Sequence, residues 1–405
     1  MTTGILSEKH IIIKSNADLM KIKWLGFTLR LLVLLLILTA GQAVGSQFLV
    51  SDDIAYETLA AEYLDFASSP IDAGAFRTIG AAGYLEAFWP WVMCFSAYLF
   101  KTAYAGRVIN IFLSVFCIEQ IYRVTMSLSD NHKTARTAAR IFAYMPVTVM
   151  TCCFPIKDIF LTYASLVFFR LILDVQNGVK IRKTGIIYCA VLLICTYNTR
   201  GAVVELYSIF IFVYLFSRLY RKRKTGWILF LSAAAVLFAV LFGNAIIAAF
   251  ATKIENYGSY ATENMGAIAL VRISGWKQLY KLPFTYFFAM LQPFRTDLFS
   301  SMNADGLFWL SVLGTLNVSI YPIAIGSFLY IFQKKSNFLF WLSTFILYSA
   351  VISLSLGIFR HYLFLLPVEI INFALMKQIN NKACNHIMIL GSFALLLAVL
   401  LLSLL

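Results

Sequence analysis

The chain has 405 residues, of which 61% are hydrophobic and only 13% are charged, and its formal net charge is +14. Soluble domains carry about a quarter charged residues, and the deficit here runs along the whole length, which excludes a soluble domain with one anchor. The basic residues form short clusters between apolar runs, as the positive-inside rule requires, and no nucleic-acid motif accompanies them, so we expect no nucleic-acid partner.

The N-terminal segment, residues 1–24, contains several lysines and is expected to lie in the cytoplasm. It lacks the short apolar region and cleavage site of a signal peptide. The apolar run over about 25–45 therefore predicts a first membrane span that is retained. Residues 25–405 are expected to form a single polytopic membrane domain.

The first outer loop, residues 46–104, is acidic. The helical spacing of Ile54, Leu59, Tyr63 and Phe66 predicts an amphipathic helix that lies on the membrane surface. The loop ends in an apolar run at 84–100, which is interrupted by Trp89-Pro90-Trp91 and carries Glu86.

The order of basic clusters predicts whether the 84–100 run crosses the membrane. Clusters at 132–140, 180–183, 218–224, 333–335 and 377–382 are all cytoplasmic only if this run is re-entrant or interfacial. Eleven crossings then follow, with the C-terminus outside and a second, larger outer loop at 251–306. The other runs lie at 106–126, 141–156, 159–173, 186–198, 202–218, 227–250, 306–332, 338–357, 361–376 and 387–405.

With that topology, polar residues from at least five segments fall on the outer side of the membrane. They are Asp52, Asp53, Lys157, Asp158, Arg200, Arg295, Arg360 and His361. Taken singly, an aspartate here is a helix cap and an arginine reaches lipid headgroups. Taken together, they are the groups needed to bind a lipid phosphate and to activate a hydroxyl. Glu119 and Arg123, by contrast, are spaced as an ordinary ion pair within one helix.

The order of these pieces resembles the GT-C glycosyltransferases, the multi-spanning superfamily that includes protein O-mannosyltransferases and the lipid A aminoarabinose transferase. The resemblance covers about residues 25–376. Its motifs are Asp52-Asp53 with Tyr56, Ala105-Gly106-Arg107-Val108-Ile109-Asn110, Met145-Pro146, Pro155 to Lys157-Asp158, Arg200, Pro293-Phe294, and Arg360-His361-Tyr362 with Pro367. A proline-rich stretch in the first loop and a soluble C-terminal domain, both found in many relatives, have no counterpart here.

The resemblance implies an all-α integral membrane fold, a GT-C-like bundle of about 11 transmembrane helices. It implies transfer of a sugar from a polyprenyl-phosphate donor to a glycolipid or glycan acceptor on the outer face of a bacterial inner membrane. Asp52, Asp53 and Asp158 would then be catalytic, or would hold a divalent cation, Mg²⁺ or Mn²⁺. Lys157, Arg200, Arg360 and His361 would bind the donor phosphate, and Tyr56, Glu86 and Arg295 would contact substrate.

Two other classes of protein remain open. A polysaccharide repeat-unit polymerase also uses outer arginines and lipid-linked sugars, although it concentrates its site in one large outer loop. A flippase or transporter of lipid-linked sugars, which is no enzyme, would place polar groups at mid-membrane in broken helices and paired repeats.

Overall fold

The computed structural model describes residues 2–43, 48, 51–79, 87–201, 276–281, 320–333, 363–364 and 366–404, with isolated residues at 203–237 and 309–316. These residues are helical, with turns and no strand, as the sequence predicts. The chain divides into two units, one of Met1–Val203, Pro293–Tyr330 and Leu366–Leu405, the other of Val204–Gln292 and Ile331–Leu365. The second contains the short helix η2 (Trp276–Lys281), and the helical bundle belongs to the first.

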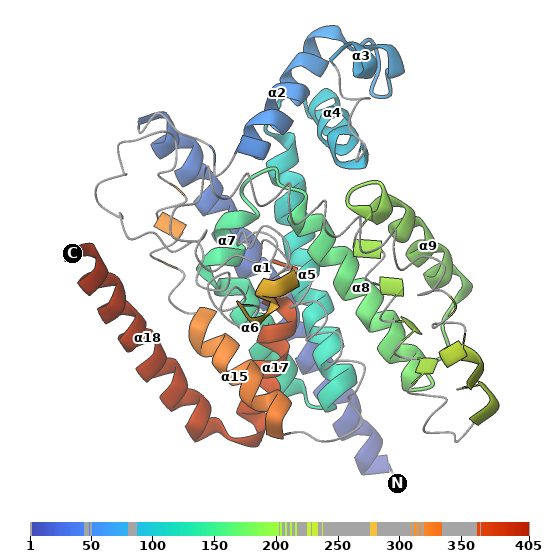
Figure 1. The fold of residues 1–405 in the computed structure, drawn as a ribbon, viewed down its shortest axis with the longest axis vertical. Coiled ribbons are helices and arrows are strands. Elements are labelled where there is room, and N and C mark those ends of the chain that lie inside the picture. Colours follow the sequence, from blue (N-terminus) through green and yellow to red (C-terminus); the bar gives the residue numbers. More distant parts are fainter. Residues whose placement is uncertain are drawn as a thin grey trace. The chain divides into compact units, whose positions relative to one another are not determined.

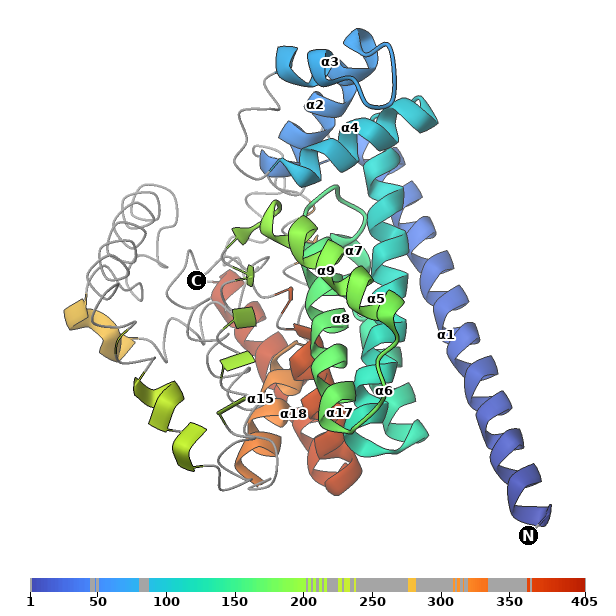
Figure 2. The ribbon, with the colours of Figure 1, turned by 90° about the vertical axis from the view of Figure 1, so that its right-hand side faces the viewer.

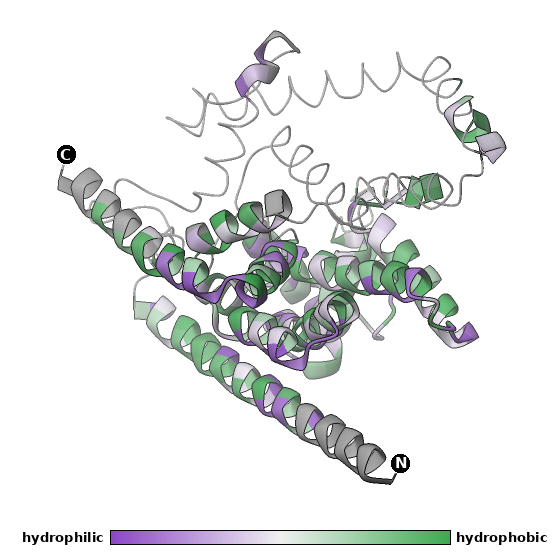
Figure 3. Cartoon of the chain, turned by 90° about the horizontal axis from the view of Figure 1, so that it is seen from below, coloured by the Kyte–Doolittle hydropathy of each residue, from purple (hydrophilic) through white to green (hydrophobic). Residues whose placement is uncertain are grey.

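Within the part of the chain that the structure describes, two helices are long and apolar enough to cross a membrane. In α1 (Thr2–Ala43) the apolar stretch is Asn16–Ala43, 28 residues that extend about 42 Å. The other is α5 (Ala105–Ser129), with 25 residues. Figure 3 shows that hydrophilic residues of α1 gather toward the N-terminus and that the remainder is mostly hydrophobic. These helices correspond to the predicted spans at 25–45 and 106–126.

Helix α5 lies at the centre of the described bundle and packs against five other helices (Figure 1). These are α1, α4 (Phe88–Phe100), α6 (His132–Tyr144), α8 (Asp158–Gln176) and α17 (Leu366–Ile379). Further described helices of the bundle are α7 (Pro146–Thr151), α9 (Lys183–Tyr197), α15 (Ile320–Gln333) and α18 (Asn381–Leu404). In the interior, the Asn372 amide of α17 donates to the Ser327 hydroxyl of α15 at 3.1 Å.

Helices α2 (Ser51–Phe66), α3 (Ala73–Thr78) and α4 form a cap beyond the end of α5 at which that helix begins (Figure 2). The cap has its own small core, which includes Tyr63, Phe76 and Cys94. The Phe76 and Trp91 rings stack with centroids 3.9 Å apart. Because α4 ends at Phe100 and α5 begins at Ala105, the two helices meet in a short turn at this end of the bundle.

Arg30 is fully buried in the apolar stretch of α1. Its guanidinium donates to the carbonyl oxygens of Ala143 at 2.8 Å and Phe142 at 3.4 Å, and to the Ser114 hydroxyl at 3.0 Å. The carbonyls at the end of a helix have no partner within it, and Pro146 prevents α6 from continuing. Arg30 thus satisfies the end of α6 and places its charge at the negative end of that helix dipole.

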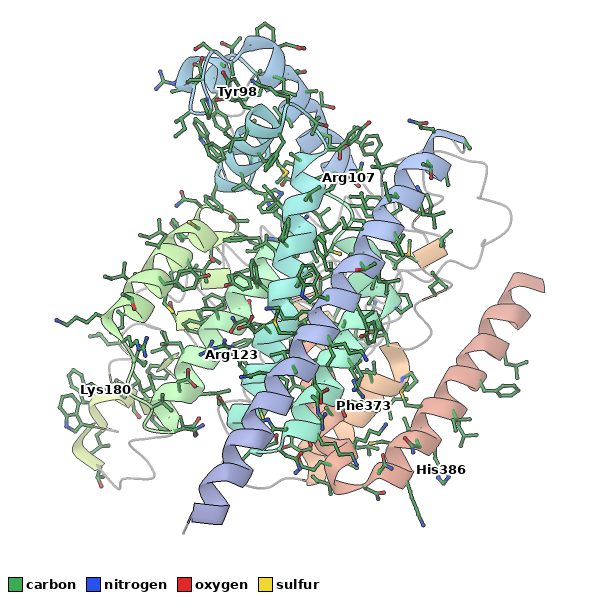
Figure 4. The ribbon with its side chains drawn as sticks, turned by 180° about the vertical axis from the view of Figure 1, so that it is seen from behind. Tyr98, Arg107, Arg123, Lys180, Phe373 and His386 are labelled. Carbon is green, nitrogen blue, oxygen red and sulfur yellow. The ribbon has the colours of Figure 1, made fainter. Side chains whose placement is uncertain are left out.

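The opposite end of the bundle carries a separate set of ion pairs. Glu119 of α5 accepts from Lys23 at 2.6 Å and also pairs with Arg123 one turn along, as the sequence predicts. Arg136 at the start of α6 pairs with Asp18 of α1. Figure 4 shows Arg107 near the upper end of α5 and Arg123 toward its lower end. Lys180 and His386 also lie in the lower half of that view. These ion pairs therefore lie apart from Arg107, toward the other end of α5.

The helix predicted from Ile54, Leu59, Tyr63 and Phe66 is present as α2, and its position on the membrane surface stays a prediction. In α2, Leu59 and Tyr63 are buried, whereas Ile54 and Phe66 are 45% and 62% exposed. The buried face of α2 also includes Asp53 and Glu57, which the spacing of apolar residues does not indicate. The run at 141–156 is not one short helix, because α6 already begins at His132 and breaks before Pro146.

Candidate functional site

The site begins at the first turns of α2, where the sequence places two adjacent aspartates. The Asp53 side chain is fully buried, and Tyr56 and Glu57 are buried one turn later. Asp52 also lies in the first turn of α2, but its side chain is outside the described residues. Acidic groups are stabilised at this position by the positive end of the helix dipole.

Arg107, in the first turn of α5, is the cation that faces α2. Its Nε donates to Oε1 of Glu57 in an ion pair whose side chains are 0% and 7% exposed. Burial raises the pKa of the Glu57 carboxyl above its ordinary value, while Arg107 opposes that rise through its hydrogen bond and its charge. The guanidinium also lies over the rings of Phe48, Tyr104 and Phe154, with centroids 5.7, 5.6 and 5.5 Å away.

The turn between α7 and α8 carries Lys157 and Asp158 into the same end of the bundle. Asn110, one turn after Arg107, donates from Nδ2 to the carbonyls of Phe154 at 2.7 Å and Ile156 at 2.9 Å. Trp89 of α4 donates from Nε1 to the carbonyl of Pro155 at 2.8 Å. Three successive carbonyls of the turn are thus held by side chains from the cap and from α5.

Asp158 begins α8 and is almost fully buried. Its Oδ1 accepts from Nη1 of Arg200 at 3.4 Å, and 21% of the Arg200 side chain is exposed. Arg200 follows the end of α9, and the carbonyl of Asn198 in that segment accepts from the backbone N–H of Phe88 at 3.2 Å. The sequence-predicted residues Asp158 and Arg200 are therefore in contact, with Lys157 beside them.

Other predicted site residues cannot be placed in this arrangement. Glu86, Arg295, Arg360 and His361 lie outside the described residues. Among the side chains that the structure does describe, no group of three or more His, Cys, Asp or Glu residues could hold a metal ion. The divalent cation remains a prediction.

Reasoning from the sequence left four residues of this arrangement out of the site. Glu57 follows Asp53 by one turn on the same helix, and Arg107 is the one basic residue of α5's first turn, so both could have been proposed from spacing and charge. Asn110 was noted in the same motif as Arg107, and Trp89 as part of the break in the 84–100 run, but nothing in the sequence indicates that they bind the same turn.

No protein-family model matches the chain, and comparisons with curated proteins and with solved structures likewise give no match. Two carboxylate–arginine pairs share one end of the bundle, and they differ in exposure. Arg107 is fully buried against α2, whereas Arg200 is partly exposed and Lys157 lies next to its partner, so the Asp158–Arg200 pair is the better candidate for contact with an anionic ligand.

Proposed function

We propose that this chain is a multi-pass membrane glycosyltransferase that takes a sugar from a polyprenyl-phosphate donor on the non-cytoplasmic face. The observation that carries the proposal is the Asp158–Arg200 ion pair with Lys157 beside it. The pair lies in an apolar bundle, at the end where α5 and α8 begin. A guanidinium and an ammonium beside a helix N-terminus are groups that bind and stabilise a phosphate. The proposal includes about 11 crossings and an outer C-terminus, as the basic clusters predict.

In this proposal the two acidic positions have different roles. Asp53, buried at the start of α2, acts as the general base toward the acceptor hydroxyl, with Asp52 beside it. Arg200 and Lys157 bind the donor phosphate, and Asp158 orients Arg200. Arg360 and His361 are assigned to the phosphate, and Tyr56, Glu86 and Arg295 to the substrates, on the resemblance to the GT-C superfamily. A divalent cation, Mg²⁺ or Mn²⁺, would neutralise the same phosphate.

Binding of a polyprenyl phosphate, compared with the matching uncharged polyprenol, tests the phosphate site. We expect wild-type protein in nanodiscs to prefer the phosphate, and Arg200→Ala to lose most of that preference. Arg200→Lys should restore it only in part, because Lys lacks the planar fork of Arg. Arg170→Ala is the matched control, since Arg170 pairs with Asp174 toward the other end of the α8 helix. Equal preference in the wild type and in Arg200→Ala would reduce Arg200 to a structural partner of Asp158.

Transfer of radiolabelled sugar from polyprenyl-phosphate hexose into glycolipid tests the general base. Asp53→Asn should lower the rate about 10²–10⁴-fold, because the amide keeps the shape of the side chain but accepts no proton. Thermal stability should change little. The control is Asp65→Asn, which alters an exposed aspartate near the other end of α2. Near wild-type transfer in both Asp53→Asn and Asp52→Asn would make these aspartates structural.

A further inference from the structure

The turn that precedes Lys157 and Asp158 is held by side chains at three consecutive peptide groups. Nδ2 of Asn110 donates to the first and third carbonyls, those of Phe154 and Ile156, at 2.7 and 2.9 Å. Nε1 of Trp89 donates to the middle carbonyl, that of Pro155, at 2.8 Å. The indole N–H thus binds the carbonyl that lies between the two bound by the amide. The three bonds together fix the direction in which the chain enters α8.

The first turn of α4 also binds the chain segment that leads to Arg200, the other partner of the ion pair. The backbone N–H of Phe88, the residue before Trp89, donates to the carbonyl of Asn198 at 3.2 Å. Asn198 lies two residues before Arg200, which pairs with Asp158 at 3.4 Å. Adjacent residues of α4 therefore bind both chain segments that bring Asp158 and Arg200 together.

The Asn110 side chain has a buried oxygen that destabilises the fold, which an apolar side chain at this position would not have. The residue is fully buried, and its Oδ1 has no hydrogen-bond partner among the described residues. A buried polar atom without a partner costs about 1–3 kcal/mol, which an aliphatic side chain at this position would avoid. Because both acceptors of Nδ2 are carbonyl oxygens, the amide orientation is fixed by the turn. The donors of Asn110 are thus the reason for an amide here.

We propose that Trp89 and Asn110 are positioning residues that set the direction of Lys157 and the register of Asp158 with Arg200. This inference rests on the proposed function, because it assigns both residues to the phosphate end of that site. Neither residue touches the phosphate in this scheme. They act through the turn, and their loss should disturb recognition of the phosphate more than recognition of the lipid tail.

Two substitutions remove the donors, and two matched controls leave the turn intact. Trp89→Phe deletes the indole N–H and keeps an aromatic ring, while Asn110→Leu deletes both amide hydrogen bonds at similar volume. Trp91→Phe changes the other tryptophan of α4, whose ring stacks on Phe76. Asn177→Leu removes a bond from an asparagine amide to the Ser127 carbonyl, 3.1 Å long, at the opposite end of α5 and α8. Trp89→Phe is the milder test should Asn110→Leu fold poorly.

Hydrogen exchange followed by mass spectrometry tests whether the hydrogen bonds of Trp89 and Asn110 stabilise the turn. In Trp89→Phe, amides of 154–161 and 198–200 should exchange about five- to tenfold faster than in wild type, since one buried hydrogen bond is lost. Amides near the Glu119–Arg123 pair at the other end should be unchanged. Trp91→Phe and Asn177→Leu should leave exchange at the turn as in the wild type. Equal exchange at the turn in Trp89→Phe and Trp91→Phe would overturn the proposal.

Binding of polyprenyl phosphate relative to polyprenol tests whether these hydrogen bonds affect recognition of the phosphate. Both Trp89→Phe and Asn110→Leu should reduce the preference for phosphate about tenfold while leaving polyprenol binding unchanged, a split that general loosening of the fold would not produce. Faster exchange at the turn with an unchanged preference would overturn the positioning role. A wild-type protein without any preference would count against the proposed function itself, and the exchange rates alone would then decide whether these residues order the turn.

Discussion

At the scale of single residues, Glu57 and Arg107 form a buried ion pair between α2 and α5. The guanidinium is fully covered and the carboxylate nearly so, at 0% and 7% exposure. Removal of one partner from such a pair leaves an uncompensated buried charge, which costs about 3–5 kcal/mol, whereas removal of both with apolar replacements is often tolerated. The pair therefore attaches the cap to the bundle only while both charges are present.

We expect Arg107→Met to destabilise the protein strongly and Glu57→Leu combined with Arg107→Met to recover much of the loss. A double-mutant cycle by thermal unfolding in detergent measures the coupling. Arg123→Ala is the control: Arg123 pairs with Glu119 on one helix and is 47% exposed, so the loss should be at most about 1 kcal/mol. Equal losses in Arg107→Met and Arg123→Ala would contradict the argument from burial.

Asp72 gives the cap a pH dependence of defined sign. Its carboxylate accepts from the N–H of Ala75 at 3.0 Å, and from the N–H and hydroxyl of Ser68 at 3.0 and 2.8 Å. The bond from Ala75, followed by those from Ser68, lowers the pKa of Asp72 to about 2. A lowered pKa in the folded state favours folding above the ordinary aspartate pKa of about 3.9, and this contribution is lost as pH falls toward 2.

We therefore expect exchange protection of the Ala75 and Ser68 amides to be constant from neutral pH to about 4, after correction for intrinsic rates, and to fall below it. Asp72→Asn keeps an acceptor for the cap but should abolish this pH dependence. A pH profile that is the same in wild type and Asp72→Asn would show that another group is responsible.

At the scale of the elements, the sequence predicted helices well and their buried faces less well. Apolar periodicity placed α5, α8 and α9 within a few residues of their observed bounds. For α2 it predicted the helix but not the burial of Asp53 and Glu57, because it follows hydrophobicity alone, whereas the Glu57 carboxylate is buried beside the opposite charge of Arg107. Periodicity within one segment carries no information about a cation that lies 50 residues away.

The same limit applies to Arg30 and to the turn before α8. A lone arginine in an apolar run is visible in the sequence, but its partners are mainly carbonyls of Phe142 and Ala143, and backbone groups leave no sequence signal. Trp89 and Asn110 also bind backbone carbonyls. In contrast, the ion pair of Glu119 with Arg123 follows from spacing on one helix, and it was predicted.

Gly326 sets the approach of α15 to α17, and its replacement tests that contact. A Cβ at Gly326 would lie 2.4 Å from Cδ2 of Phe373, a ring that is only 2% exposed (labelled in Figure 4). Overpacking costs about 1–3 kcal/mol, while Gly→Ala in a helix gains about 1 kcal/mol. We expect Gly326→Ala to lower the thermal midpoint. Gly185→Ala, where the nearest side-chain atom is 3.5 Å away, should leave it equal or higher, and the reverse order would refute this packing.

At the scale of the whole molecule, the described part of the first unit has two chemically distinct ends. One end holds the Glu57–Arg107 and Asp158–Arg200 pairs together with the cap, and the other holds the Lys23–Glu119–Arg123 and Asp18–Arg136 pairs. The basic cluster at 132–140 lies at the second end, where α6 begins, and Lys180 follows the end of α8 on the same side (Figures 2 and 4). By the positive-inside rule, this sorting supports the proposed orientation, in which the second end is cytoplasmic.

Helix α4 is connected to the same end of the bundle at both of its own ends. Its first residues bind the carbonyls of Pro155 and Asn198, and its last residues lead within a short turn to the start of α5. Both ends of α4 thus lie at the end of the bundle with the cap, although its sequence is apolar enough to suggest a span.

We expect a reporter inserted after Lys101 to read outside, and reporters after Asp130 and Gly178 to read cytoplasmic. The C-terminus, after Leu405, should read outside, since α18 begins beside the basic residues Lys377 and Lys382 and runs away from them. A cytoplasmic reading after Lys101 would mean that α4 crosses, and a cytoplasmic reading after Leu405 would break the parity on which the outer site depends.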